Sequence, residues 1–197
     1  MRKIVTLLLA LMLAASAYAE GEQLLLRRVA DYMAKMGSYD AEVDVTAGEY
    51  RATGSYAVAG DNYHIKIGVA EVFSDGKSRY EIDHERKEVS VDVVDLESRN
   101  ILDNPTRCFD FVGEDYTAEI ARKDDKETTL RLVARDKDIE GEILLTLQNS
   151  TGKPLSISYL LYDDRIDVEI KSLAPRKTKL RTFSKGDYKG YDMVDFR

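Results

Sequence analysis

The sequence predicts an α+β fold that is mostly β: one strongly curved antiparallel sheet in the form of a half-open barrel, with an N-terminal helix and a short helical lid. Three observations predict it. One long helical pattern comes first, about ten segments with strand periodicity follow, and one short apolar segment interrupts them. A single sheet of so many strands curls or closes, because twist and exposed edges both penalise a flat form.

The N-terminal residues read as a secretory signal peptide. Arg2 and Lys3 form a short basic region, residues 4–15 are almost entirely apolar, and residues 17–19 have the small-x-small pattern of a cleavage site. A membrane anchor is the other interpretation, but the apolar run is short for a bilayer span and ends in the processing motif. We therefore expect a signal peptide at residues 1–19 and one domain at residues 20–197.

Residues 20–35 carry the one long helical pattern. Apolar side chains recur at three- and four-residue intervals, which gives the helix one apolar face to pack on a sheet. Gly37 is a natural end for this helix. The apolar positions are Leu24, Leu25, Val29, Tyr32, Met33 and Met36.

From Tyr39 onwards the apolar residues alternate with polar ones, which predicts strands with one buried face. Gly54 in the middle of a strand suggests a bend or a bulge. Asp75 and Gly76 predict a hairpin turn. The segments that read as strands are 39–46, 50–58, 63–69, 87–94, 117–122, 128–135, 142–148, 155–162 and 165–173, together with the two arms of the hairpin 72–82.

A short apolar segment follows the first group of strands. Asn104 can cap a helix and Pro105 suits its first turn. Phe109, Phe111 and Val112 then place apolar side chains on more than one side of a very short element. Such an element needs a partner on each side or a cavity beneath it, so we expect it to cover the sheet.

The sequence argues against an enzyme. Its two histidines, His64 and His84, lie on the polar side of a strand and in a charged turn, and we expect both to be solvated. Cys108 has no neighbour that marks a nucleophile, which favours a small buried thiol. The sequence has no phosphate-binding glycine loop, nucleophile elbow or metal-spaced cysteine pair. We therefore expect no catalytic residues, no metal and no cofactor.

The charge balance disfavours some partners. The 29 basic residues become 27 without Arg2 and Lys3, against 36 acidic residues, so the net charge of the predicted mature chain is −9. An acidic chain is a poor ligand for nucleic acid or anionic membranes. Residue 20 is glutamate, not the cysteine that carries a lipid anchor, so we expect a soluble exported protein with no stable membrane insertion. The basic stretch 176–181 suits an acidic partner or a solvated loop or edge strand.

The order of these elements resembles the periplasmic outer-membrane lipoprotein carrier proteins (LolA-like), in particular their divergent Bacteroidetes-type branch. The resemblance covers nearly the whole predicted mature chain, although each motif is short. The motifs are Met36-Gly37-Ser38-Tyr39 before an alternating strand, Phe73-Ser74-Asp75-Gly76-Lys77 followed by Tyr80, Asn104-Pro105, and the ending Met193-Val194-Asp195-Phe196-Arg197.

The resemblance implies a function. A member of this family is a periplasmic monomer that holds the acyl chains of lipoproteins inside a half-open barrel under a helical lid. It takes them from an inner-membrane exporter and passes them to an outer-membrane acceptor. One departure concerns the lid: the family commonly has an Arg-Pro pair after the second strand, whose arginine latches the lid, whereas this chain has Ala59-Gly60-Asp61. The resemblance therefore leaves the latch undefined.

The candidate lipid-binding residues follow from the pattern and the resemblance together. An ordinary packed core is the alternative interpretation at each position. The alternative function is a periplasmic lipid-binding or envelope-stress sensing protein of the same fold. The expected cavity wall is Tyr56, Val58, Tyr63, Ile65, Ile67, Phe73, Tyr80, Ile82, Val91 and Val93, and the expected lid residues are Ile101, Leu102, Phe109, Phe111 and Val112.

Overall fold

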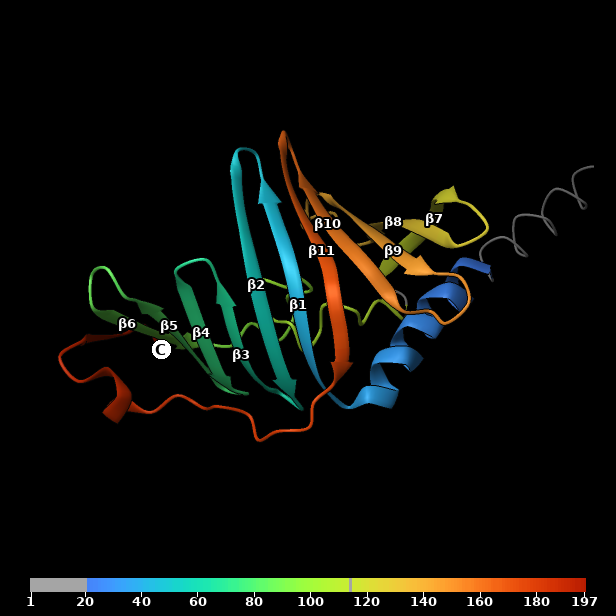
Figure 1. The fold of residues 1–197 in the computed structure, drawn as a ribbon. Helices are drawn as coiled ribbons and strands as arrows, with labels where there is room; N and C mark the ends of the chain where they lie inside the picture. The colour runs from blue at the N-terminus through green and yellow to red at the C-terminus, as the bar shows by residue number, and fades with distance from the viewer. Residues whose placement is uncertain (1–20, 114) are drawn as a thin grey trace, which may run out of the picture.

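One twelve-stranded sheet dominates the computed structural model, which describes residues 21–113 and 115–197 (Figure 1). The predicted signal peptide at residues 1–19 lies outside the described residues. The strand order is β12-β6-β5-β4-β3-β2-β1-β11-β10-β9-β8-β7, so the sheet is not closed into a barrel. Neighbouring strands are antiparallel except β12, which pairs parallel with β6. The predicted mostly β fold with one curved, half-open sheet is confirmed.

The first eleven strands are close to the predicted segments, and the twelfth, near the C-terminus, was not predicted. They are β1 (Ser38–Ala47), β2 (Tyr50–Ala59), β3 (Asn62–Ile67), β4 (Ala70–Asp75), β5 (Ser78–Asp83), β6 (Glu88–Val93), β7 (Tyr116–Lys123), β8 (Glu127–Ala134), β9 (Glu142–Gln148), β10 (Pro154–Leu161), β11 (Asp164–Pro175) and β12 (Asp192–Asp195), with a 3-10 helix η1 at Lys185–Tyr188.

Residues 21–36 form the N-terminal helix. Gly37 ends it as predicted, with φ at 65° and its N–H donating to the carbonyl of Met33. The buried side is centred on Leu26 and Val29, whereas Leu24, which we expected on the apolar face, is exposed. Leu26, Val29 and Met33 share one helical stripe, and Leu24 lies off it. Among the described residues, no helix combines the length and apolar composition that a membrane span requires.

Strand pairing defines two faces of the sheet, because residues directly opposite each other on paired strands share a face. Val58 of β2 lies opposite Tyr39 of β1 and Tyr63 of β3. We call the face that bears these residues the lid face and the other the outer face. The main core lies on the lid face and continues through β11, β10, β9 and β8, where Val168, Ile157, Leu145 and Leu130 are fully buried.

Residues 94–113, here called the lid segment, lie behind β1–β3 in Figure 1, against the lid face. The expected cover of the sheet is therefore present, but it is not the helix we predicted: residues 101–103 and 105–109 form separate hydrogen-bonded turns. The physical reason lies in the hydrogen bonds that the backbone carbonyls of this segment accept. In a helix capped by Asn104, the Pro105 carbonyl would accept from the N–H of Phe109, whereas here it accepts from the Tyr39 hydroxyl of β1 and from the Cys108 thiol.

Gly54, whose place in mid-strand suggested a bend or a bulge, occupies a crowded position. It lies opposite Val43, where β1 has a bulge in its pairing with β11. A Cβ atom at Gly54 would meet Ile67 Cγ1 at 2.8 Å and the Lys66 carbonyl oxygen at 3.0 Å. The close approach of β1, β2 and β3 at this point therefore requires glycine.

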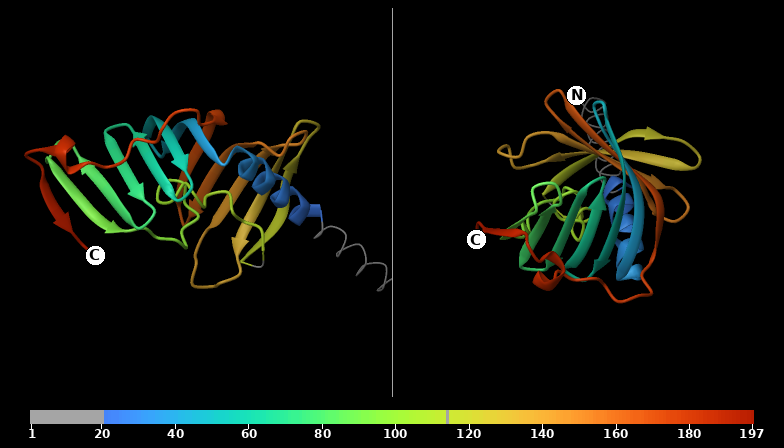
Figure 2. Two further views of the ribbon diagram at one scale, coloured as in Figure 1. Left: turned by 90° about the horizontal axis from the view of Figure 1, so that it is seen from below. Right: turned by 60° about the vertical axis from the view of Figure 1, so that its left-hand side comes forward.

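The C-terminal segment, residues 176–191, runs along the sheet from the end of β11 to β12, the edge strand beside β6 (Figures 1 and 2). The basic stretch 176–181 at its start makes contacts within the chain, since Arg176 pairs with Asp40 and Arg181 with Glu71. Further along, the segment covers a second, smaller apolar cluster. That cluster contains Phe73, Ile82, Val89, Val91 and Tyr188, with Tyr80, Phe183 and Tyr191 packed against it.

Candidate functional site

Tyrosine side chains of the sheet hold the lid segment by its main chain. The Tyr39 hydroxyl of β1 donates to the carbonyl of Pro105 at 2.9 Å, and the Tyr63 hydroxyl of β3 donates to the carbonyl of Asp103 at 2.9 Å. Tyr159 of β10 donates to the carbonyl of Arg99 at 3.1 Å and accepts a hydrogen bond from the N–H of Ile101 at 2.7 Å. These tyrosines belong to distant strands, so the lid segment ties the sheet together.

A fourth tyrosine of the same face has no such partner. Tyr56 of β2 is 2% exposed, yet its hydroxyl has no hydrogen-bond partner among the described residues. Burial raises the pKa of the Tyr56 hydroxyl, and the nearby Cys108 thiol adds to that rise. Burial likewise raises the pKa values of Tyr39 and Tyr159 well above their ordinary range. All three hydroxyls therefore stay protonated, and those of Tyr39 and Tyr159 donate to the lid segment.

Three cavities border the lid segment. One, of about 250 Å³, lies on the lid face of β1, β3 and β4 and is lined mainly by apolar side chains such as Ile65, Ile67 and Leu102. A second, of about 310 Å³, lies between the N-terminal helix, Val58 and Phe109. The third, of about 440 Å³, is lined by residues of β8, β9 and β10 and by the start of the lid segment. The lid segment thus covers the lid face without filling it.

The structure brings part of the predicted site together. Tyr56, Val58, Tyr63, Ile65 and Ile67 share the lid face and pack in or against the main core. The lid residues Ile101, Phe109 and Phe111 are buried in the same cluster, Leu102 packs against it, and Val112 is 38% exposed. Their packing places these residues at the sheet–lid interface, and whether they bind lipid stays a prediction.

The other predicted wall residues do not share that face, which corrects the single continuous wall that we expected. Val72 lies opposite Ile65, so its neighbour Phe73 points to the outer face. Tyr80 lies opposite Phe73 and Val91, and Ile82 lies on the same side as Tyr80. Phe73, Ile82 and Val91 are buried under the C-terminal segment, with Tyr80 packed against them, whereas Val93 is 60% exposed.

The reason for this change of face lies in β4. Its residues Glu71, Val72, Phe73 and Ser74 are all buried, so this strand is covered on both faces. On β1, β2 and β3 the apolar positions point to the lid segment, and on β5 and β6 they point to the C-terminal segment. Alternation within each strand could not reveal the change, because it fixes only which residues share a side of that strand.

A polar cluster around Glu71 fastens the C-terminal segment to the outer face. The Glu71 carboxylate accepts hydrogen bonds from His64 Nε2 at 2.8 Å, His84 Nε2 at 3.2 Å and the Tyr188 hydroxyl at 3.0 Å. Lys66 Nζ lies 3.2 Å from it and Arg181 3.0 Å. The expectation that both histidines are solvated is wrong for His64, whose side chain is 13% exposed.

Opposing effects set the pKa values in this cluster. Burial alone would raise the pKa of Glu71, but hydrogen bonds from His64, Tyr188 and Lys66 outweigh burial and hold it at about 2. Burial lowers the pKa of His64, and Lys66 and Arg181 add to that effect against the pull of Glu71. The Glu71 carboxylate thus carries one negative charge, and four side chains that can be positively charged lie around it: His64, Lys66, His84 and Arg181.

The sequence contained one signal for this cluster. Lys66 and Glu71 lie directly opposite each other on the hairpin β3–β4. Reading that hairpin register from the Gly68 turn would have placed this opposite-charge pair together and His64 beside it. Among residues 21–113 and 115–197, no group of three or more His, Cys, Asp or Glu side chains is arranged to hold a metal ion.

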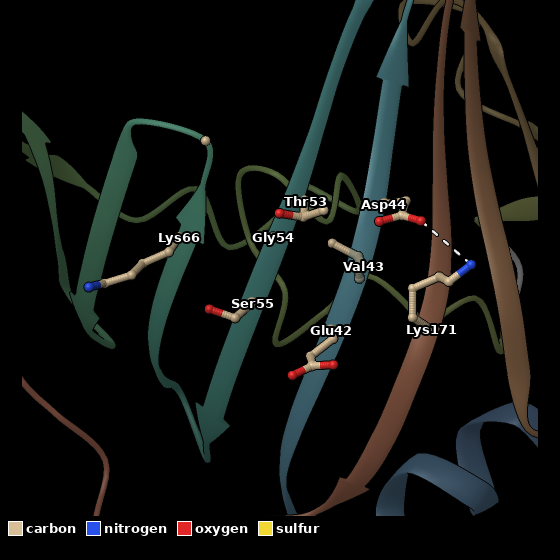
Figure 3. Close-up of a pocket in the computed structure, with 9 residues that line it drawn as sticks. Glu42, Val43, Asp44, Thr53, Gly54, Ser55, Lys66 and Lys171 are labelled. Carbon is tan, nitrogen blue, oxygen red and sulfur yellow. Dashed lines mark ion pairs between the residues drawn. The ribbon is translucent and has the colours of Figure 1, made fainter.

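The outer face of β1, β2, β3 and β11 is polar. A shallow depression of about 460 Å³ there is lined by Glu42, Thr53, Ser55, Lys66 and the pair of Asp44 and Lys171, whose charged groups lie 3.5 Å apart (Figure 3). Asp44 and Lys171 are both half-exposed, so the pair is screened by solvent. The two faces of these strands therefore differ sharply in character, apolar towards the lid segment and polar on the outside.

No protein-family model matches the sequence, and no curated protein matches it closely enough to count as a relative. Among solved structures, the chain is similar to an uncharacterised conserved protein from Thermus thermophilus, with a TM-score of 0.55 and 12% identity over 88% of this chain and 98% of that one. That likeness concerns the fold alone.

Two further similar structures carry names from the family that the motifs resemble. One is a LolA superfamily protein from Nitrosomonas europaea, with a TM-score of 0.42 and 11% identity over 85% of this chain and 96% of that one. The other is a putative outer membrane lipoprotein-sorting protein domain from Vibrio parahaemolyticus, with a TM-score of 0.47 and 10% identity over 87% and 97%. Proteins of this kind are thus among the structural neighbours of the chain, and function does not follow from likenesses of this degree.

Proposed function

We propose that this chain is a periplasmic carrier that binds the acyl chains of lipoproteins between the lid face and the lid segment. The observation that carries the proposal is the way in which the lid segment is held. It covers an apolar sheet face with cavities along it, and tyrosine hydroxyls fasten it by its main chain. A cover attached in this way can be exchanged for another apolar occupant.

The energetics of exchange suit a carrier. Each methylene of an acyl chain left in water costs about 0.8 kcal/mol, so the cargo needs an apolar surface. Acyl chains that enter would displace Ile101, Phe109 and Phe111, which are buried on the lid face in this structure. When the cargo binds, the apolar side chains of the lid lose the free energy of their burial on the sheet. The net affinity is lower than the acyl area alone implies, and release is correspondingly easier.

The rest of the proposal follows from the predicted signal peptide and the family resemblance. The chain would act in the periplasm as a soluble, non-lipidated monomer. It would take lipoproteins from an inner-membrane exporter and give them to an outer-membrane acceptor. No catalytic step and no cofactor are needed, because burial of the acyl chains supplies the driving force for binding.

Binding of acyl ligands to the purified, lipid-free protein tests this function. We expect a fluorescent fatty-acid probe and an acylated lipoprotein to bind and to raise the melting temperature. Leu102→Trp would fill part of the cavity of about 250 Å³ and weaken probe binding by about tenfold, which corresponds to about 1.4 kcal/mol. Leu24→Trp is the matched control, because Leu24 is 58% exposed on the N-terminal helix, and it should leave binding unchanged.

Two outcomes would change the conclusion. If neither ligand binds or stabilises the lipid-free protein, acyl binding itself is refuted. If both bind but the protein does not move lipoprotein from inner-membrane to outer-membrane vesicles, the carrier role is refuted. The lipid-binding or envelope-stress sensing role of the same fold would then replace it.

A further inference from the structure

The acceptors that the lid-face tyrosines use are all of one chemical kind. Tyr39, Tyr63 and Tyr159 each donate to a peptide carbonyl of the lid segment, at 2.9, 2.9 and 3.1 Å. Each hydroxyl is thus positioned for a neutral C=O acceptor in an apolar environment. If the lid segment moves away, these donors lose their acceptors, and a buried donor without an acceptor is costly.

Tyr56 extends this set by one donor that has no acceptor in this structure. It lies opposite Ile65, two pairs along the β2–β3 ladder from Val58 and Tyr63, so its side chain is on the lid face with those of the other tyrosines. Its hydroxyl is buried and has no partner among the described residues. Buried polar groups are nearly always paired, so an unpaired hydroxyl at this position points to an acceptor that is present only in another state.

We propose that these tyrosine hydroxyls form a binding site for the ester and amide carbonyls of the cargo's acyl groups, with Tyr56 reserved for the cargo. This inference rests on the proposed function and specifies the chemistry that the site recognises. An ester or amide carbonyl accepts the same hydrogen bond as a lid peptide carbonyl, so the cargo replaces the lid at these donors. A plain hydrocarbon or an ether-linked chain of the same length offers apolar area but no carbonyl acceptor.

The neutral state of the site supports this choice of ligand. Burial raises the pKa values of Tyr39, Tyr56 and Tyr159, so these hydroxyls stay protonated at neutral pH. No bond is made or broken on binding, and only hydrogen-bond partners are exchanged. The site therefore distinguishes acylated molecules from other apolar ones without charge.

A pair of matched probes tests the inference. Dioctanoylglycerol has two ester carbonyls, and dioctylglycerol, its diether, has the same chain length without them. Displacement of a fluorescent fatty-acid probe gives the affinity of each. We expect the diester to bind at least about fivefold more tightly than the diether, because one neutral hydrogen bond contributes about that factor.

Tyr56→Phe isolates the contribution of the unpaired hydroxyl. It removes no hydrogen bond from the closed structure, so we expect an unchanged or slightly raised melting temperature. Diester affinity should fall about fivefold and diether affinity should stay the same. In infrared spectra, the band of isotopically labelled ester carbonyls should shift on binding to the wild type, and shift less with Tyr56→Phe. Tyr80→Phe, on the outer face, is the control and should change neither affinity.

The outcomes separate the two proposals. Equal affinity of the wild type for diester and diether overturns carbonyl recognition and leaves acyl binding intact. A diester preference that Tyr56→Phe does not reduce overturns the role of Tyr56. Failure of the diester to displace the bound fatty-acid probe likewise overturns carbonyl recognition, whereas failure of the fatty-acid probe and the lipoprotein to bind refutes the proposed function, on which the inference rests.

Discussion

The Tyr63 hydroxyl donates a hydrogen bond of 2.9 Å to the backbone carbonyl of Asp103, across 40 positions of sequence. This contact fastens the lid segment to β3, close to the turn where the family resemblance led us to look for an arginine. In this chain that turn reads Ala59-Gly60-Asp61. Here neutral tyrosine hydroxyls of the sheet bind the main chain of the lid segment, so these three contacts involve no charged side chain.

Removal of the Tyr39 hydroxyl should weaken the lid attachment. Tyr39→Phe leaves the Pro105 carbonyl with the Cys108 thiol as its donor, so we expect a loss of about 0.5–1.5 kcal/mol in unfolding free energy. Urea unfolding measures the loss, and hydrogen exchange of residues 94–113 should rise in the same variant. Tyr56→Phe is the matched comparison, because it removes a hydroxyl without a partner. Equal destabilisation by the two variants would contradict the assignment of the Tyr39 bond.

Glu71 should make the stability of the protein depend on pH in the acid range. Its pKa is about 2 in the folded protein, below the ordinary value of 4.5. The stabilisation is thus complete above 4.5 and is lost as pH falls towards 2. We expect Glu71→Gln to reduce the unfolding free energy by about 1–3 kcal/mol near neutral pH, and the difference from wild type to vanish at low pH. Urea unfolding across this range measures both.

Glu81→Gln is the control for that experiment. Glu81 pairs with Arg79 at 2.6 Å, but its side chain is 52% exposed, and exposed ion pairs contribute little. A loss of stability as large as that of Glu71→Gln would show that burial in the cluster is not the cause.

His64 should loosen the C-terminal segment as pH falls below its ordinary pKa. Burial lowers the folded-state pKa of His64 below 6.5, with Lys66 and Arg181 acting in the same direction. The unfolded chain therefore binds the proton first, and the stability that neutral His64 provides is lost as pH falls from 6.5 through the folded value. Proteolysis at residues 176–191 should accelerate in that interval.

His64→Gln separates this effect from general acid sensitivity. A glutamine cannot take up the proton, so the change in proteolysis between about pH 6.5 and pH 5 should disappear. Nuclear magnetic resonance titration of the imidazole gives the pKa directly. A value at or above 6.5 in the folded protein would contradict the prediction.

Gly54 should tolerate no side chain. In Gly54→Ala the new Cβ would meet Ile67 Cγ1 at 2.8 Å and Val43 Cγ2 at 3.1 Å, so the strands must shift. We expect a loss of about 1–3 kcal/mol in unfolding free energy, as for other overpacked positions. Gly186→Ala is the control, because its nearest contact would be Ser184 Oγ at 3.5 Å, and it should be close to neutral. An equally stable Gly54→Ala would show that the approach at β2 is not tight.

The strands and turns of this fold could be predicted from the sequence because they depend on local chemistry. Period-two alternation located the strands to within a few residues, and Gly37 and the Asp75–Gly76 turn ended elements as expected. The helical lid could not be predicted correctly. Asn104 and Pro105 permit a helix, but the tyrosines that bind the Asp103 and Pro105 carbonyls come from strands far away in sequence.

The sequence by itself determined a mostly β chain with a helix at its start, an apolar cover in its middle and little that suggests catalysis. Only the tertiary structure decided which apolar residues share a surface. Val72 and Phe73 are adjacent, both apolar and both buried, yet they belong to opposite faces and different clusters. Alternation determines which residues of one strand share a face. Pairing register determines which residues of neighbouring strands share that face, and the covering segments determine whether it is buried. Those segments, the lid and the C-terminal residues, are placed by contacts that local sequence does not encode.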